Sequence, residues 1–258
     1  MLPEIDIFGL ELQTFGLMLA LALVASGVIV SKRLPELGKP ADWAYEMLFV
    51  AGAGGIAGAK LWFVIEKGDL GGLFSGTGLV FYGGAIGGTL AVCLWASRKG
   101  MLNAALFDMG APGLAIGYAV GRLGCQLAGD GDYGIPSDLP WAMAYPKGTV
   151  PTTVEVHPTP IYEFLVMSAV TWWLWRHRDS FRPGSLFAIW AVLAGVERFL
   201  IEFIRRNEDI VGPFSLAQLV SVVMILAGGA WLLRARMSSP DQAGGPASVR
   251  RTQRSAMP

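Results

Sequence analysis

The chain has 258 residues, of which 53% are hydrophobic and only 16% are charged. Soluble domains usually carry about 25% charged residues, so this composition predicts a membrane protein and argues against a soluble one. The formal net charge is zero, which offers no excess of positive charge for nucleic acid, and we expect no nucleic-acid partner.

Apolar stretches recur along the chain, and each is long enough to cross a hydrocarbon core, which needs about 20 helical residues. They lie at residues 10–30, 43–65, 79–97, 104–124, 160–176, 185–204 and 214–233. We therefore predict an all-α integral membrane protein with seven transmembrane helices in one domain, residues 1–237. A long loop at 125–159 joins the fourth and fifth helices, and the polar segment 238–258 is predicted to be a disordered tail.

The orientation follows from the distribution of the 20 Lys and Arg residues, most of which fall on one side of this arrangement. Segments 32–39, 176–182 and 234–254 supply many of them. The positive-inside rule makes this side cytoplasmic, so the N-terminus and the 125–159 loop lie outside and the C-terminal tail lies in the cytoplasm. No Lys or Arg precedes the first apolar stretch, so we expect it to remain as an anchor and not to be cleaved as a signal peptide.

Glycines four residues apart occur in several predicted helices, for example Gly54 with Gly58 and Gly83 with Gly87. Small residues at this spacing let membrane helices approach closely, so packing explains most of these pairs. Gly83 and Gly84 stay open as candidate substrate-binding residues because they follow Tyr82 near the predicted outer end of the third helix.

Charged residues inside the apolar stretches are the best guide to function, because a charge at the centre of a membrane helix costs about 2.5 to 3.5 kcal/mol on insertion scales. Arg198, Glu202 and Arg205 follow one another at spacings of four and three, which puts them on one face of the sixth helix. Lys60 and Arg122 add cations from the second and fourth helices. Cations that converge from three helices suit an anionic group that arrives through the lipid, and a phospholipid phosphate is the obvious one.

A structural alternative exists for these charges. Asp130 and Glu202 can neutralise Arg122 and Arg198 as ion pairs that serve only the fold.

No metal site or disulfide is predicted. The two histidines, His157 and His177, fall on opposite sides of the membrane, and Cys93 and Cys125 fall toward opposite ends of their helices. Nothing in the sequence calls for an organic cofactor.

Four segments in order resemble the motifs of the prolipoprotein diacylglyceryl transferase family. They are 121–124 (Gly-Arg-Leu-Gly), 157–163 (His-Pro-Thr-Pro-Ile-Tyr-Glu), 198–205 (Arg-Phe-Leu-Ile-Glu-Phe-Ile-Arg) and 218–221 (Gln-Leu-Val-Ser). The resemblance implies a multi-pass enzyme of the bacterial plasma (inner) membrane. Such an enzyme takes diacylglycerol from phosphatidylglycerol, attaches it to a cysteine thiol of a lipoprotein precursor and releases glycerol phosphate.

The resemblance also implies roles for individual residues. Arg122 and Arg198 stabilise the charge that develops on the departing phosphate, Glu202 holds Arg198 in position, and Lys60 stands where the family usually has arginine. The candidate substrate-binding residues are Lys60, Gly83, Gly84, Cys125, Asp130, Tyr162, Glu163, Glu202, Arg205 and Gln218.

Three departures from the family pattern lie at the edge of the predicted site, on the side expected to receive the acceptor thiol. Phe15 replaces a tyrosine, Tyr82 replaces the histidine of a His-Gly-Gly motif, and residues 125–130 replace Asn-Phe-Ile-Asn-Gly-Glu. Tyrosine titrates near pH 10 and histidine near 6.5, so Tyr82 is a poor general base, although it can donate a hydrogen bond to phosphate. If a base is required, His157, Asp130 and Asp132 are the candidates, and the unperturbed pKa of His157 is the most suitable.

Three interpretations follow. The first is transfer to the lipobox cysteine of a prolipoprotein. The second is a divergent enzyme with the same lipid donor and another acceptor, and the third is a protein that binds or moves phospholipid without reacting with it. The sequence lacks the paired inverted halves of many transporters, which counts against the third.

Overall fold

The computed structural model describes residues 1–7, 10–68, 71, 80–207 and 212–237, so the predicted tail lies outside the described residues. The described chain is mostly helical, as predicted. Its helices are α1 (Thr14–Glu36), α2 (Trp43–Lys67), α3 (Phe81–Arg98), α4 (Ala104–Ala128), α5 (Thr159–Arg176), α6 (Ser185–Ile201), the 3-10 turn η2 (Glu202–Ile204) and α7 (Leu216–Met237). Among the described residues, α1, α2, α4 and α7 are long and apolar enough to cross a membrane by length and composition.

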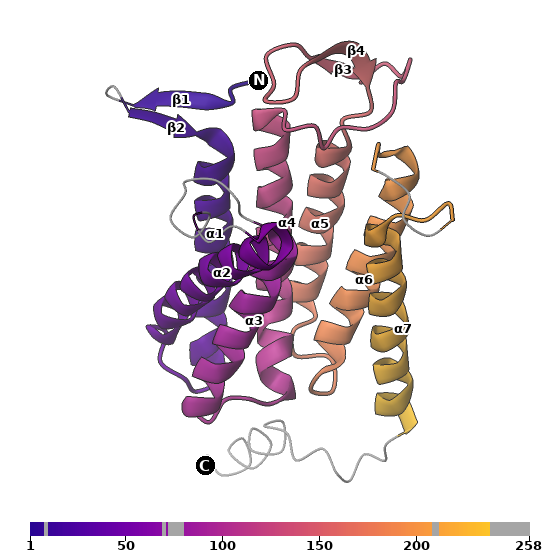
Figure 1. Cartoon of the computed structure of the whole chain (residues 1–258). Helices are drawn as coiled ribbons and strands as arrows, with labels where there is room; N and C mark the ends of the chain where they lie inside the picture. Colours follow the sequence, from indigo (N-terminus) through magenta and orange to yellow (C-terminus); the bar gives the residue numbers. More distant parts are fainter. Residues whose placement is uncertain (8–9, 69–70, 72–79, 208–211, 238–258) are drawn as a thin grey trace, which may run out of the picture.

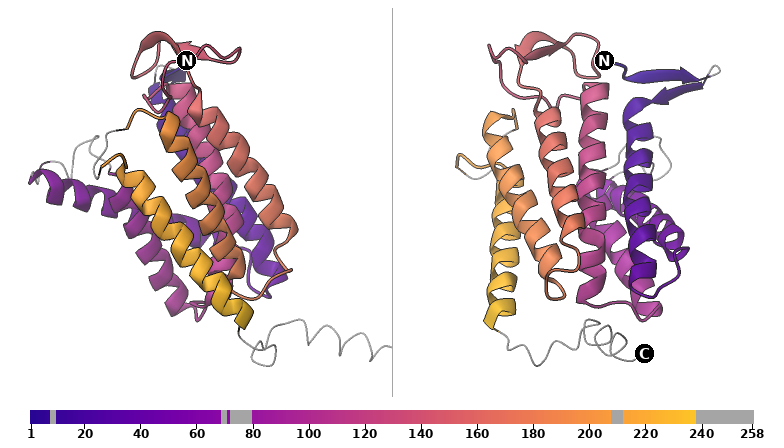
Figure 2. Two further views of the ribbon diagram at one scale, coloured as in Figure 1. Left: turned by 90° about the vertical axis from the view of Figure 1, so that its right-hand side faces the viewer. Right: turned by 180° about the vertical axis from the view of Figure 1, so that it is seen from behind.

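The helices α1, α4, α5, α6 and α7 stand side by side, while α2 lies across them at a steep tilt and packs against α3 (Figures 1 and 2). The central helix is α4, which packs against α1, α5 and α6. Its core face carries Ala111, Ala115 and Ala119, all completely buried. These small side chains let the neighbouring backbones come close, which is how helices pack when lipid supplies no hydrophobic driving force between them.

Large apolar side chains cover the outside of the helices. Phe49 and Ile65 on α2 are 76% and 79% exposed, and Trp172 on α5 is 66% exposed. Exposed apolar surface of this extent is unfavourable in water and is expected where lipid is the solvent.

The contact between α2 and α3 is made by glycines. A Cβ at Gly58 would collide with the backbone of Gly83 and Gly87, and a Cβ at Gly54 would collide with Ala91 and Gly87. The predicted packing role of the paired glycines therefore holds here. Gly83 is part of the same contact, because its own Cβ would collide with Trp62 and Gly58.

The prediction of an all-α protein is incomplete, because two antiparallel hairpins lie at one end of the bundle, here called the hairpin end (Figure 1). The first pairs β1 (Glu4–Ile7) with β2 (Leu10–Gln13), so α1 begins at Thr14 and not at residue 10. The second pairs β3 (Met143–Tyr145) with β4 (Thr152–Val156) inside the predicted loop. The β-branched run Thr-Thr-Val in β4 favours a strand.

The predicted loop 125–159 also begins too early. Helix α4 continues through Cys125 to Ala128 and ends at Gly129, whose φ of 61° lies in the left-handed region that glycine tolerates. The connection between α4 and α5 therefore starts at residue 129.

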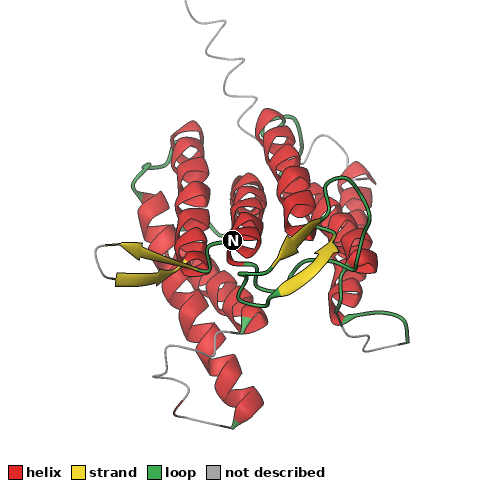
Figure 3. Cartoon of the chain, turned by 90° about the horizontal axis from the view of Figure 1, so that it is seen from above, coloured by secondary structure: helices red, strands yellow, loops and turns green. Residues whose placement is uncertain are grey.

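The second hairpin covers the ends of the helices when the molecule is seen from above (Figure 3). Tyr133, Tyr145 and Val156 form a small apolar cluster beneath it. Tyr145 donates a hydrogen bond to Gln126 on α4 at 2.9 Å, and burial raises the pKa of Tyr145 to about 12. The hairpin is therefore fastened to the bundle by buried side chains.

Polar contacts also fasten the opposite end of the bundle. Asp108 on α4 accepts hydrogen bonds from the backbone N–H groups of Gly184 at 2.6 Å and Phe187 at 2.8 Å, at the start of α6. This carboxylate lies at a helix N-terminus, where negative charge is favourable. Asp108 is thus explained by the fold, although it interrupts an apolar stretch of the sequence.

Candidate active site

Six charged side chains meet at the hairpin end between α4, α5 and α6, and they are here called the ionic cluster. The cluster consists of Arg122, Asp132, Glu163, Arg198, Glu202 and Arg205. The arginines of the predicted fourth and sixth helices therefore do converge.

Glu163, in the first turn of α5, is the centre of the cluster, and its side chain is completely buried. Its Oε2 lies 3.1 Å from Nε of Arg122 and 3.6 Å from Nη1 of Arg205. Its Oε1 lies 3.5 Å from Nη1 of Arg198 and accepts a hydrogen bond from the Tyr118 hydroxyl at 2.9 Å. One carboxylate thus serves three guanidinium groups, which keeps three cations close together inside apolar surroundings.

Arg198 is held from its other side by Glu202, whose Oε2 lies 2.7 Å from Nη2 of Arg198. Oε1 of Glu202 accepts hydrogen bonds from Ser215 at 2.5 Å and from Asn207 at 2.7 Å. The arrangement matches the positioning role expected for Glu202.

Gln218, which is predicted to bind substrate, caps the start of α7. Its Oε1 accepts from the backbone N–H of Ser215 at 3.1 Å, and its own N–H donates to Oγ of Ser215 at 3.3 Å. This is a capping box, which satisfies two free N–H groups at the helix start. Because Ser215 also donates to Glu202, the cap of α7 supports the carboxylate that holds Arg198.

The prediction of a single helix through Arg198, Glu202 and Arg205 needs correction. Helix α6 ends at Ile201, the chain makes a 3-10 turn over Glu202–Ile204, and Arg205 is extended. The side chains still meet, because Nε of Arg205 lies 3.8 Å from Oε2 of Glu202. The backbone of Arg205 also bridges to Gly134 in the loop above.

Asp132 ties this loop to the cluster through short ion pairs with Arg122 and Arg205. Burial opposes ionisation of Asp132, but the two guanidinium groups outweigh it and lower the pKa of this carboxyl. Asp130 differs, because burial and the neighbouring Asp132 raise its pKa. The structural alternative for the arginines is thus partly correct: Glu202 pairs with Arg198, but Arg122 pairs with Asp132 and Glu163 and not with Asp130.

The pairing leaves hydrogen-bonding capacity unused. Nη1 of Arg198 and both Nη1 and Nε of Arg205 are buried and have no hydrogen-bond partner of good geometry. Buried donors of this kind are rare in proteins and call for an explanation. A phosphate oxygen is the natural acceptor for them, because guanidinium groups match phosphate geometry.

The remaining predicted cation, Lys60, lies on α2, which packs mainly against α3. Its contact with substrate stays a prediction. Gly83 and Gly84 lie at the contact between α2 and α3, where a Cβ would collide at Gly83 but would make only ordinary contacts at Gly84. Substrate binding by these two glycines stays a prediction. Tyr82 lies in the first turn of α3, beside this contact.

His157 and Tyr162 lie together at the edge of the covering loop. Nδ1 of His157 is 3.4 Å from the hydroxyl of Tyr162, which accepts a hydrogen bond from Nε1 of Trp141 at 2.7 Å. Both residues are partly exposed. They lie next to the ionic cluster, because Tyr162 directly precedes Glu163 in α5.

Cys125 is buried one turn after Arg122, and its Sγ lies 3.8 Å from Nη1 of Arg122. Cys125, Asp130 and Asp132 each offer one atom that can bind a metal, within 4.8 Å of one another. Two guanidinium groups already occupy Asp132, and their positive charge opposes a cation there. The donor set therefore suits a metal poorly.

Four described contributors to the site escaped the sequence analysis, namely Tyr118, Glu197, Asn207 and Ser215. Tyr118 precedes Arg122 by one helical turn, and the Arg122 guanidinium lies 5.0 Å from the centre of its ring. The spacing of four could have indicated Tyr118, and the Ser-x-x-Gln pattern before α7 could have indicated the cap formed by Ser215. No local pattern marks Glu197.

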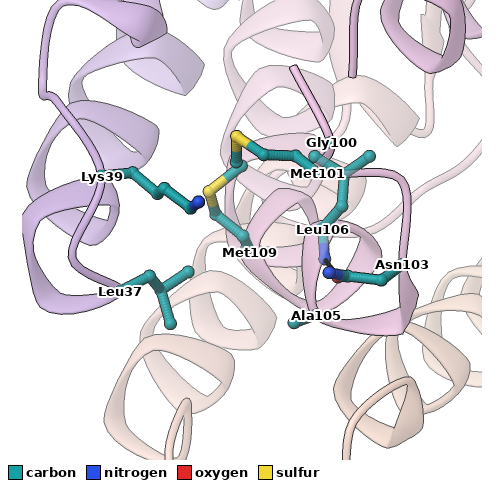
Figure 4. Close-up of a pocket in the computed structure, with 8 residues that line it drawn as sticks. All are labelled: Leu37, Lys39, Gly100, Met101, Asn103, Ala105, Leu106 and Met109. Atoms are coloured by element: carbon teal, nitrogen blue, oxygen red, sulfur yellow. Dashed lines mark hydrogen bonds between the residues drawn. The ribbon is translucent and has the colours of Figure 1, made fainter. Parts of the chain in front are cut away.

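A separate pocket opens at the other end of the bundle (Figure 4). Leu37, Met101, Leu106 and Met109 line it together with Lys39 and Asn103. Its volume of about 160 Å³ is below the roughly 300–1,000 Å³ typical of ligand pockets, and the ionic cluster contributes nothing to it.

The fold and the cluster together define a helical membrane protein with a buried polar site at one end of the bundle. Comparison with protein families extends this result, because the family model for prolipoprotein diacylglyceryl transferase matches residues 4–234. The chain belongs to that family, which is a family of membrane enzymes.

Its relatives include three proteins named phosphatidylglycerol–prolipoprotein diacylglyceryl transferase. The one from Clostridium tetani is 30% identical over 234 residues, covering 86% of this chain and 93% of that protein. The one from Gloeobacter violaceus is 29% identical and covers 92% of this chain and 94% of that protein. The one from Bordetella avium is 31% identical and covers 89% of this chain and 93% of that protein.

Proposed function

We propose that this chain transfers the diacylglyceryl group of phosphatidylglycerol to the lipobox cysteine of a prolipoprotein. The similarity to the named relatives extends over most of the chain and supports this activity. The lipid donor and the lipoprotein precursor are then the two partners, and the bilayer is the medium in which they meet.

The observation that carries the proposal is the set of three arginines around Glu163 with buried donors left unused. In the reaction, the acceptor sulfur forms a bond to the glycerol carbon that bears the phosphodiester. The bond from that carbon to oxygen breaks, and the electron pair leaves on the phosphate. Guanidinium groups fixed in advance near this oxygen stabilise the charge as it develops, in a site with little water to compete.

The carboxylates of the cluster prepare the site for this task. Three carboxylates, Asp132, Glu163 and Glu202, compensate three arginines while no phosphate is bound. They also restrict the guanidinium groups to one geometry, so little reorganisation is needed when the phosphate arrives. Arg122 and Arg198 are the residues to which we assign direct contact with the phosphate.

We further propose that α3, α5 and α6 cross the membrane together with the four longer helices. Helix α6 has 17 α-helical residues and α5 has 18, which lie at the lower limit for crossing a bilayer. The hairpin end then faces outward and the C-terminal tail lies in the cytoplasm, as the distribution of Lys and Arg favours. In a bacterium this places the protein in the plasma (inner) membrane.

The assay that tests the activity uses the purified protein, labelled phosphatidylglycerol and a lipobox peptide. Wild-type protein is expected to shift the mobility of the peptide, and Arg198→Ala to lower the rate at least about 100-fold, as for loss of one donor to a developing negative charge. Arg176→Ala is the matched control, because Arg176 is exposed at the far end of α5. The proposal fails if Arg198→Ala retains the wild-type rate.

A second candidate is transfer from the same lipid to another acceptor. It is favoured by the departures at Phe15, Tyr82 and Cys125, while the arginines that would hold the lipid phosphate are present. Consumption of the lipid that depends on Arg198 and on membrane extract, without a peptide shift, would favour this candidate. Binding of the lipid without any turnover would favour a phospholipid-binding or transport protein.

A further inference from the structure

Glu197 is a partly buried acid beside the ionic cluster. It lies on α6, directly before Arg198, and its Oε2 is 3.5 Å from the hydroxyl of Tyr118. Its Oε1 is buried and has no hydrogen-bond partner. In the described part of the chain, Glu197 takes part in no ion pair within 4.0 Å, unlike Glu163 and Glu202.

The hydrogen bonds of Tyr118 determine which of the two neighbouring acids carries a proton. A tyrosine hydroxyl has one proton to donate, and Tyr118 directs it to Oε1 of Glu163 at 2.9 Å. Oε2 of Glu197 therefore faces the lone pairs of the hydroxyl oxygen. An ionised carboxylate can only accept, so it would place acceptor against acceptor, whereas a neutral carboxyl can donate to that oxygen.

The charges on the surrounding elements also indicate that the protonated acid is Glu197 and not Glu163. Glu163 has Arg122, Arg198 and Arg205 around it and is stable as an anion. The groups that face Glu197 are Tyr118 and Arg122 on α4, Glu163 on α5 and Arg198 on its own helix. Helix α7 adds no titratable side chain at this level, because its Arg234 and Arg236 belong to its last turn.

We propose that Glu197 is held as a neutral carboxylic acid and acts as the general acid of the transfer reaction, giving its proton to the departing phosphate. This inference rests on the proposed function. Glu197 directly precedes Arg198 in the chain. Tyr118 lies between Glu197 and Glu163, and Glu163 in turn contacts Nη1 of Arg198. Within the described chain this Nη1 group has no hydrogen-bond partner and can donate to a phosphate.

The proton balance of the step is complete. The carbon–sulfur bond forms, the carbon–oxygen bond breaks, and the phosphate oxygen takes the electron pair together with the proton of Glu197. The acceptor thiol gives its proton to water before the sulfur attacks, and the Glu197 carboxylate takes a proton back from water after the glycerol phosphate has left. The glycerol phosphate therefore leaves without a second full negative charge in a site of low polarity, and Glu197 returns to its starting state.

The test compares Glu197→Gln with wild-type protein in the peptide assay over a range of pH. A glutamine amide can still donate to Tyr118, so folding and lipid binding are kept, but it cannot transfer a proton. We expect kcat to fall about 100-fold, in the range of general acid catalysis, while KM for phosphatidylglycerol stays unchanged. The wild-type kcat should decline as pH rises and Glu197 loses its proton, and the variant should lose this decline.

Glu66→Gln is the matched control, because Glu66 is 48% exposed at the end of α2. A wild-type rate and pH profile for Glu197→Gln would overturn the proposal. A rise in KM for phosphatidylglycerol with an unchanged kcat would also overturn it, because Glu197 would then have a purely structural role.

A second readout does not depend on turnover. The difference infrared spectrum of wild type minus Glu197→Gln in lipid nanodiscs should show the carbonyl stretch of one neutral carboxylic acid near neutral pH. Absence of this band overturns the inference about Glu197. If the band is present while wild-type protein lipidates no peptide, the proposed function has failed and the neutral state of Glu197 still stands.

Discussion

Two neighbouring aspartates show how the position of a single residue decides the sign of its electrostatic contribution. Asp132 contacts two arginines and has a lowered pKa, while Asp130, two residues earlier, is partly buried beside Asp132 and has a raised pKa. A carboxyl whose pKa is lowered by folding stabilises the fold when ionised. One whose pKa is raised destabilises the fold when ionised.

This contrast predicts opposite effects for two isosteric substitutions. Asp132→Asn is expected to lower stability by about 2 kcal/mol at neutral pH, because hydrogen-bonded charges contribute on the order of 1.5–3 kcal/mol. The stabilisation by Asp132 is complete above its unfolded pKa of about 3.9 and is lost as pH falls through its lower folded pKa, so the difference shrinks only in acid. Asp130→Asn is expected to leave stability unchanged or raised at neutral pH, since it removes a cost that grows as pH rises from the unfolded pKa of about 3.9 to the raised folded pKa.

Thermal unfolding in detergent, followed from about pH 2.5 to about pH 8, measures both effects, because this interval extends to both sides of the unfolded pKa of about 3.9. A destabilised Asp130→Asn and an unaffected Asp132→Asn would contradict the assignment of the two carboxyls.

Among the elements, the pair α2 and α3 depends most directly on small residues. Gly54, Gly58 and Gly87 bring the two backbones together, and Gly83 does the same at the first turn of α3. The pair makes fewer contacts with the upright helices, since α2 packs mainly against α3. Close approach of the two backbones is therefore the main contribution that holds α2 against α3.

Gly58→Ala is expected to separate α2 from α3, because the added Cβ meets the backbone of α3 and neither partner can give way. Overpacking of this kind costs about 1–3 kcal/mol. Gly229→Ala is the matched control, since nothing lies within 4 Å of a Cβ added at Gly229 in α7. Thermal stability in detergent should fall for the first variant and stay the same for the second; equal stability of both would remove the packing argument.

At the scale of the whole molecule, charge and function are divided between the two ends of the bundle. The hairpin end holds the ionic cluster beneath the β3–β4 cover (Figures 1 and 3). The opposite end holds basic residues such as Arg33, which pairs with Asp179 at 2.6 Å and joins α1 to the connection between α5 and α6. This division suits a protein whose reactive site faces outward and whose basic end faces the cytoplasm.

Reporter fusions test this orientation. A green fluorescent protein fused after residue 258 is expected to fluoresce, because it folds in the cytoplasm. Alkaline phosphatase inserted after Lys147, in the covering loop, is expected to be active, because it requires an oxidising compartment. The opposite result at both positions would reverse the orientation.

The sequence by itself determined that this is a helical membrane protein, because long apolar runs leave few other structures possible in lipid. It also singled out Arg122, Arg198 and Arg205 as candidate functional residues, because charges in such runs are costly. Spacing along one segment identified the Arg198–Glu202 pair, which one helical turn brings together.

Only the tertiary structure decided the partners that come from different segments. Spacing gives the face of a helix but not the neighbour that this face meets, so the sequence could not show that Glu163 lies among three arginines. For the same reason it missed the contact of Tyr118 with Glu163 and Glu197. Packing between α4, α5 and α6 brings these residues together, and that packing depends on side-chain shapes along whole helices.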